Sequence, residues 1–321
     1  MKAINLVEGS LVWDEAVTPD IGPGLIRIPT ELLLSIEQIS LNELGHIHLP
    51  QGLAPYWVWS VLEPLRKSAM VYESVSRRFR LCSSVRRWLC GASCSARRAS
   101  SPIPKGLSFI EAASLPEVYA TAFLNLYIEA QAKRNEIVLV HAGASGVGTA
   151  SIQLCSNFGN PCFITAGSEE KIERCIKLGA ENGANRKSKH FFEILRDWSS
   201  GRGIDVILDP VGADYLESNL SLLALEGRLV LIGLMGGASA ELNLGRMMQK
   251  RLRIIGSTLR ARSVAAKSSV IDALESQVWP LIESGDIQPV VETVLPIQQA
   301  NLAHELLATN DTFGKVVLSI D

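Results

Sequence analysis

The sequence lacks a hydrophobic run long enough to cross a bilayer, and it lacks an excess of charge of either sign. A membrane-spanning helix needs roughly 18 consecutive apolar residues. The 321 residues include 31 Lys and Arg against 33 Asp and Glu, which gives a formal net charge of −2 at pH 7. Binding to nucleic acid or anionic lipid generally depends on a basic surface field. We therefore expect neither a membrane nor a nucleic acid as a partner.

The N-terminal segment lacks the features of a targeting signal. Its sequence, MKAINLVEGSLVWDEAV, has acidic residues where a signal peptide has its apolar core, and it has no Arg- and Ser-rich transit character. With 47% hydrophobic and 20% charged residues, the composition is that of a globular protein of one large or two ordinary domains. The expected location is the cytoplasm.

The cysteines lack the spacing of metal ligands. The first three have no CxxC pair and no well-spaced fourth ligand. The last three fall in a segment where reduced, buried thiols are expected. The six are Cys82, Cys90, Cys94, Cys155, Cys162 and Cys175. No metal site is predicted.

A small-residue turn separates an apolar strand from a helix in VLVHAGASGVGTASIQLC, Val138–Cys155. Glycines allow close approach of the backbone to a ligand, and the N–H groups and positive dipole end of the helix that follows attract an anion. The turn suggests a phosphate-bearing nucleotide, although a tight strand–helix connection alone would use the same residues.

Apolar strands alternate with helices from Pro102 onward. A helical segment over 108–130 comes first, and a long helical region precedes the last strand. The predicted strands are 137–142, 161–166, 203–212, 227–237, 252–259 and 315–320, and the helices between them are 149–159, 168–180, 190–200 and 215–224. Val-, Ile- and Leu-rich strands of this kind are typical of a sheet covered on both faces. The predicted fold class is therefore α/β, with a doubly wound parallel sheet of the Rossmann type.

The end of the second strand, in ITAGSEEK, lacks the Asp or Glu that holds the ribose of NAD about 20 residues past such a turn. Gly167 instead leaves space, Ser168 offers a hydroxyl group and Lys171 offers a positive charge. These groups suit a 2′-phosphate, so NADPH is predicted over NADH. Glu169 and Glu170 oppose this choice unless they only complement the dipole of the helix.

The first hundred residues differ from this pattern. Short strands and a Pro/Gly turn are predicted over 1–28, and ELLLSIEQISLNEL at 31–44 predicts a helix. The segment 74–100 is dense in Arg, Ser and Cys. A basic surface explains it most simply, and it has too few interleaved aromatic residues for an RNA site.

Residues 1–28 and 102–321 resemble the quinone oxidoreductase branch of the medium-chain dehydrogenase/reductase superfamily, and in particular the stress-inducible NADPH:quinone oxidoreductases. The motifs are IPKGLSFIEAASLPEVYATAF, HAGASGVGTASIQL, TAGSEEK, KLGAENG, DVILDPVG, RLVLIGLMGG, STLRARS and FGKVVLSID. The resemblance implies a GroES-like, β-rich catalytic lobe at 1–115, a Rossmann NADPH-binding domain at 116–260, and a segment at 261–321 that completes the catalytic lobe. It also implies a zinc-independent homodimer.

The implied chemistry is direct hydride transfer from NADPH to a quinone or a related electrophilic carbonyl compound. No general acid is evident, so the catalytic residues stay unknown. The family's cofactor positions correspond to Thr121, Gly143, Ser145, Gly146, Val147, Gly148, Ser168, Lys171, Arg186, Gly233, Leu234, Met235 and Asn310. Where the family often has Tyr, Arg186 could meet a phosphate but would change the stacking contact. For Arg260 and Arg262, a solvated strand edge is as good an explanation as a cofactor role.

Three family motifs, NRADL, LGLExSG and GGGYAE, are absent between residues 30 and 101. Each is permitted in a shifted reading frame, at Ser35–Ser40, Tyr56–Ser60 and Arg86–Gly91 respectively. The single codon of Trp constrains the second case, because reading Tyr56–Ser60 one base earlier, with Ser60 encoded as AGY, gives Leu-Gly-x-Glu with little freedom. We interpret 30–101 as a frame-shifted translation that leaves the first lobe incomplete. The rival interpretation is a divergent lobe with its own role. The alternative function is a nucleotide-binding, catalytically defective protein, as in crystallin-like relatives.

Overall fold

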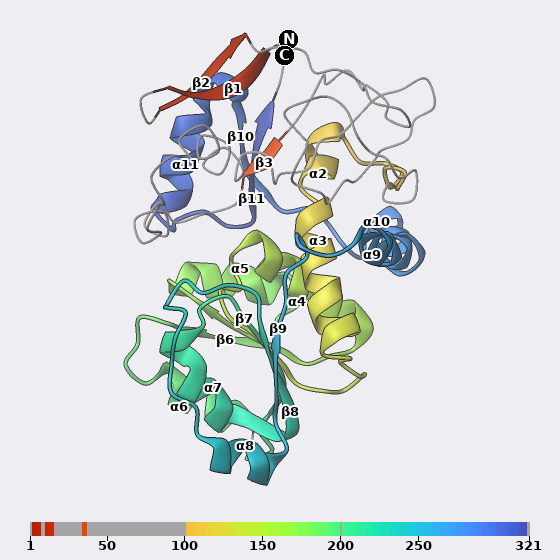
Figure 1. The fold of residues 1–321 in the computed structure, drawn as a ribbon. Coiled ribbons are helices and arrows are strands. Elements are labelled where there is room, and N and C mark those ends of the chain that lie inside the picture. The colour runs from red at the N-terminus through yellow and green to blue at the C-terminus, as the bar shows by residue number, and fades with distance from the viewer. Residues whose placement is uncertain (1, 8–9, 16–33, 37–100, 200, 320–321) are drawn as a thin grey trace. The chain divides into compact units, whose positions relative to one another are not determined.

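The structure, a computed structural model, describes residues 2–7, 10–15, 34–36, 101–199 and 201–319. The chain divides into two compact units (Figure 1). One is Val118–Leu259, and the other combines Met1–Glu117 with Arg260–Asp321.

Six parallel strands form the sheet of the unit Val118–Leu259. They are β4 (Val138–Val140), β5 (Cys162–Ala166), β6 (Asn182–Asn185), β7 (Ile204–Asp209), β8 (Leu223–Leu231) and β9 (Arg253–Gly256). The spatial order is β6-β5-β4-β7-β8-β9, and every neighbouring pair is parallel. Numbered along the chain this is 3-2-1-4-5-6, the order of a dinucleotide-binding Rossmann sheet. The predicted α/β fold is confirmed.

Helices cover this sheet on both faces. As a result, successive residues of β4 and β5 are all buried. The helices of this unit are α4 (Gly146–Phe158), α5 (Glu169–Lys177), α6 (Phe191–Trp198), the 3₁₀ turn η4 (Ala213–Tyr215), α7 (Leu216–Leu222) and α8 (Leu244–Lys250). Helix α3 (Pro116–Phe123) leads into it and continues as the π-helical turn η3 (Leu124–Glu129). Leu139, Ile207 and Leu229 lie in the core without exposure to solvent. Burial of each such side chain contributes roughly 1.5–3 kcal/mol.

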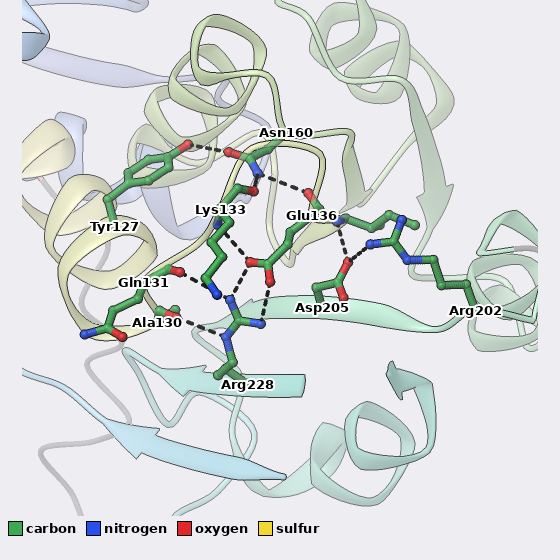
Figure 2. A network of polar contacts seen from close by, with 10 residues as sticks. Tyr127, Ala130, Gln131, Lys133, Glu136, Asn160, Arg202, Asp205 and Arg228 are labelled. Atoms are coloured by element: carbon green, nitrogen blue, oxygen red, sulfur yellow. Dashed lines mark hydrogen bonds and ion pairs between the residues drawn. The ribbon is translucent and has the colours of Figure 1, made fainter. Parts of the chain in front are cut away.

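A polar network closes the amino-terminal end of the same sheet (Figure 2). The buried side chain of Arg228 on β8 donates from Nε to the carbonyl oxygen of Ala130 at 3.0 Å and pairs with the carboxylate of Glu136. Burial would raise the pKa of Glu136, but hydrogen bonds from Arg228 and from the Lys133 N–H, together with the positive charges of both residues, leave this pKa below its usual value. The network ties the end of η3 to the start of β4, far along the strands from the glycine turn.

The described residues of the other unit form two small sheets. Strands β10 (Val291–Pro296), β11 (Lys315–Ser319) and β3 (Leu34–Ile36) form one, and β1 (Lys2–Val7) pairs antiparallel with β2 (Ser10–Glu15) in the other. The helices are α2 (Phe109–Ala113), α9 (Val264–Gln277), α10 (Trp279–Ser284), η5 (Ile297–Gln299) and α11 (Ala300–Ala308). None of the described helices is long and apolar enough to span a membrane.

One predicted element is wrong, and three were missed. Leu34–Ile36, placed in a predicted helix, is strand β3, because the backbone of β11 offers antiparallel partners that local periodicity does not reveal. β6 was missed because NGAN has a single buried residue, Ala184, and no apolar run. Helix α8 was missed as well, and so was strand β10, which interrupts the long region predicted to be helical before the last strand. Residues 37–100 lie outside the described residues. They include Cys82, Cys90 and Cys94 and most of the segment assigned to a frame shift.

Candidate nucleotide-binding site

The glycine turn ends at the amino terminus of α4. Ser145 caps this helix, because its Oγ accepts a hydrogen bond from the Gly148 N–H at 3.0 Å. Gly146 and Val147 form the half-buried first turn, and their N–H groups have no acceptor within the helix. A helix amino terminus of this kind attracts an anion. The turn lies beside the point between β4 and β7 where the strand order reverses.

Two of the predicted glycines are needed for packing. A Cβ atom at Gly143 would stand 2.7 Å from the Cβ of Ile164, and one at Gly148 would collide with the carbonyl oxygen of Ala142. The N–H of Gly148 is already donated to Ser145. Gly143 therefore lets the turn pack closely on β5, and Gly148 lets α4 pack closely on the turn, so the groups facing outward come from Ser145 to Val147.

A small polar cluster lies where β5 and β6 end. Ser168 caps α5, and its Oγ accepts from the N–H of Lys171 at 3.4 Å. The N–H of Arg186 donates to the carbonyl oxygen of Ala166 at 2.9 Å. A Cβ atom at Gly167 would lie 3.6 Å from Nε of Arg186, so the guanidinium group stands over this glycine. The space expected at Gly167 therefore holds a second cationic group.

One of the two acidic residues of this cluster is hydrogen-bonded to a neighbouring strand. Glu169 accepts a hydrogen bond from the side-chain amide of Asn185 at 3.0 Å, on the neighbouring strand β6. Glu169 and Glu170 are exposed residues of the first turn of α5, where negative charge stabilises a helix.

The loops after β7 and β8 are joined by backbone hydrogen bonds. The N–H of Met235 donates to the carbonyl of Pro210 at 3.2 Å, and the N–H of Gly236 donates to the carbonyl of Val211 at 2.7 Å. Any side chain at Gly233 would come within 2.7 Å of the Pro210 carbonyl oxygen. Leu234 and Met235 are large apolar residues, 48% and 59% exposed. This loop pair presents apolar surface at the carboxyl edge of the sheet.

A buried polar chain beneath these loops was not predicted. His141 follows β4, and its ring nitrogens lie 3.0 Å from Thr165 Oγ1 and 2.8 Å from Asn219 Oδ1. Asn219 donates in turn to Asp209 Oδ2 at 3.0 Å. Burial lowers the pKa of His141 to about 4 and raises that of Asp209 to about 6. A polar residue at the end of an apolar strand, as in VLVH and VILD, was the available signal.

The remaining predicted residues are more scattered. Thr121 is half-buried on α3, and its carbonyl accepts from the amide of Asn125 at 2.7 Å. Asn310 belongs to the other unit, where it follows α11 with a φ of 59°. Arg260 and Arg262 lie beyond the end of β9, so the strand-edge interpretation is wrong for them.

The described residues contain no group of three His, Cys, Asp or Glu side chains placed to hold a metal ion. Cys155, Cys162 and Cys175 are free, buried thiols, as expected.

Known proteins share this arrangement. A model of a family described as zinc-binding dehydrogenase matches residues 146–276. The quinone oxidoreductase of Rattus norvegicus is 31% identical over 225 residues, which cover 70% of this chain and 67% of that enzyme. The chain belongs to the quinone oxidoreductase branch of the medium-chain dehydrogenase/reductase superfamily. The resemblance inferred from the motifs is thereby confirmed.

Two solved structures are similar to this quinone oxidoreductase family member. The quinone oxidoreductase of Thermus thermophilus, solved also in complex with NADPH, has a TM-score of 0.74 and 26% identity over 99% of this chain and 100% of that one. An NAD-dependent alcohol dehydrogenase has a TM-score of 0.75 and 25% identity, covering 100% of both chains. The protein is thus an oxidoreductase. These two neighbours differ in the nicotinamide cofactor that they are described with, so the choice between NADPH and NADH depends on this chain's own residues.

Proposed function

We propose that this oxidoreductase reduces quinones or related electrophilic carbonyl compounds by direct hydride transfer from NADPH, without zinc. The observation that carries the proposal is the position of the Arg186 guanidinium over Gly167. NAD enzymes of this fold carry an acidic residue at the end of the second strand instead. The named relatives and the order of the sheet support the same reaction class.

The pyrophosphate would lie at the amino terminus of α4. The N–H groups of Gly146 and Val147 would donate to it, and the helix dipole would favour its negative charge. Ser145 would keep the first turn in place through its bond to Gly148. Gly143 and Gly148 would act by allowing the close packing that brings these donors to the surface of the turn.

The 2′-phosphate would lie beside Gly167. Ser168 offers a hydroxyl group, Arg186 offers a planar guanidinium that can bind two phosphate oxygens, and Lys171 adds positive charge at the first turn of α5. Glu169 is held by Asn185, so its carboxylate is tied to β6. NADH has no group that uses these cations, which is why NADPH is preferred in this proposal.

When bound, the nicotinamide supplies the hydride. Gly233, Leu234 and Met235 would line its ribose, and the two exposed apolar side chains would keep water from the reacting face. Thr121 would contribute from α3, and Asn310 stays a prediction of the family resemblance. No described side chain is assigned as a general acid, and the proton that completes the reduction would come from water.

The test is quinone-dependent oxidation of NADPH by the full chain after exhaustive chelation, with metal content measured in parallel. Turnover that persists in metal-depleted protein supports the proposal. Turnover lost with the metal and restored by Zn²⁺ contradicts the zinc-free reaction. Tight NADPH binding without turnover on any quinone or enone would favour the alternative function, a nucleotide-binding but catalytically defective protein. Gel filtration tests the expected homodimer in the same preparation.

A further inference from the structure

The negative charge of Asp209 sets the direction of a buried hydrogen-bonded chain that crosses three strands. Asp209 has no solvent exposure, and an ionised carboxylate can only accept. The amide NH₂ of Asn219 must therefore face Asp209, at 3.0 Å, and its oxygen must face His141. His141 then donates from Nε2, and its bare Nδ1 accepts from the hydroxyl of Thr165 at 3.0 Å.

The two ends of this chain meet the loops that the proposed function uses. At one end, Thr165 Oγ1 accepts from the N–H of Ala142, in the glycine turn, at 3.3 Å. At the other end, Asp209 accepts from the N–H of Val211 at 2.6 Å and of Gly212 at 3.2 Å.

The loop after β7, which Asp209 holds, is hydrogen-bonded to the loop after β8, whose residues are proposed to line the nicotinamide ribose. Val211 accepts from Gly236, and the N–H of Ala213 donates to the carbonyl of Gly237 at 3.0 Å. The N–H of Asp214 donates to Gly236 at 3.2 Å. The position of Gly233–Gly237 therefore depends on the loop that the carboxylate of Asp209 orders.

We propose that Asp209, anchored to the glycine turn through Asn219 and His141, is a positioning residue that sets the nicotinamide-side loops for hydride transfer. The proposal rests on the proposed function, because it assigns these loops to NADPH. Asp209 touches neither cofactor nor substrate in this account. It acts by fixing Val211 and Gly212, and its anchor keeps them in register with the pyrophosphate turn.

The test is the variant Asp209→Asn, with Asp205→Asn as the matched control on the same strand. An amide at 209 brings its own two donors to a place where three donors already converge, so at least one of them loses its acceptor. Asp205 makes comparable bonds at the opposite end of β7, to the N–H of Ile137 and to Arg202, each at 2.8 Å.

Two ligands test the adenosine half and the nicotinamide half of the site separately. NADPH spans both halves, whereas adenosine 2′,5′-bisphosphate occupies only the adenosine half. We expect D209N to weaken NADPH binding by about 10-fold or more and to leave the bisphosphate unaffected, while D205N changes neither. Amide hydrogen exchange should also accelerate in 210–214 and 233–237 of D209N, with no change there in D205N.

Equal effects of D209N on both ligands, or slow exchange in those loops as in the unaltered protein, would overturn the proposal. If the unaltered chain binds neither ligand, the proposed function fails, and hydrogen exchange alone then decides whether Asp209 orders the loops. Should D209N not fold, Asn219→Ser breaks the anchor while leaving the bonds to Val211 and Gly212. It is expected to weaken NADPH binding alone, and an unchanged affinity would count against the proposal.

Discussion

The guanidinium of Arg186 lies over Gly167, where a Cβ atom would come within 3.6 Å of its Nε. Gly167 follows the second strand of the sheet and Arg186 follows the third, and the two meet because Ala166 is paired with Asn185. The pairing of β5 with β6 thus brings a cation to the position that distinguishes NADPH from NADH.

Replacement of Arg186 by Gln should raise KM for NADPH by about 10-fold, since it removes a charge-assisted phosphate contact. KM for NADH should not change. The effect should shrink as salt is added, because Arg186 is exposed and its charge is screened. Lys187→Gln removes the same charge one residue further along, and it should leave the cofactor preference as it was. A parallel loss with NADH would contradict the role given to Arg186.

The buried chain at His141 and Asp209 predicts opposing effects of pH on stability. The pKa of Asp209 is raised from 3.8 to about 6, so its contribution to the free energy of unfolding falls as pH rises through that range. The pKa of His141 is lowered from 6.5 to about 4, so its contribution rises between those values. The two effects offset one another in the unaltered protein.

D209N should therefore gain stability relative to the unaltered protein by about 2 kcal/mol between pH 4 and pH 6, on top of any constant loss from broken hydrogen bonds. Urea unfolding at several pH values measures this difference. Parallel curves for the two proteins across the range would show that Asp209 titrates normally.

The network of Figure 2 predicts a large effect on stability and none on cofactor affinity. Arg228→Met leaves the carboxylate of Glu136 without its buried partner, which typically costs about 3–5 kcal/mol. Urea unfolding should show this loss, with KM for NADPH unchanged. The exposed pair of Arg251 and Glu226 provides the control, since Arg251→Met should change stability by less than about 1 kcal/mol. Similar losses in the two variants would contradict the structural weight given to Arg228.

The frame-shift hypothesis predicts which peptides the native source contains. Tandem mass spectrometry searched against both translations of 30–101 should find peptides with LGLE- and GGGYAE-like sequences. Detection of SAMVYESVSR, as it stands in this sequence, would instead support a divergent lobe.

Sequence reasoning succeeded where the signal is local. Strands such as VLV and VIL are apolar on both faces, and the glycine turn and the helix that begins at Ser168 lie within a few residues of the strands that they follow. It failed where the partner is distant. His141 and Asn219 are 78 positions apart, and only the packing of α7 against the sheet joins them. Leu34–Ile36 forms strand β3 because it pairs with β11, and the sequence of β6 has no apolar pattern.

The most direct test of the account compares kcat/KM for NADPH and NADH in the unaltered chain, with one quinone as acceptor. The account predicts a preference for NADPH of about 100-fold, which corresponds to two strong charge-assisted contacts with the 2′-phosphate. Equal values for the two cofactors, or a preference for NADH, would contradict it.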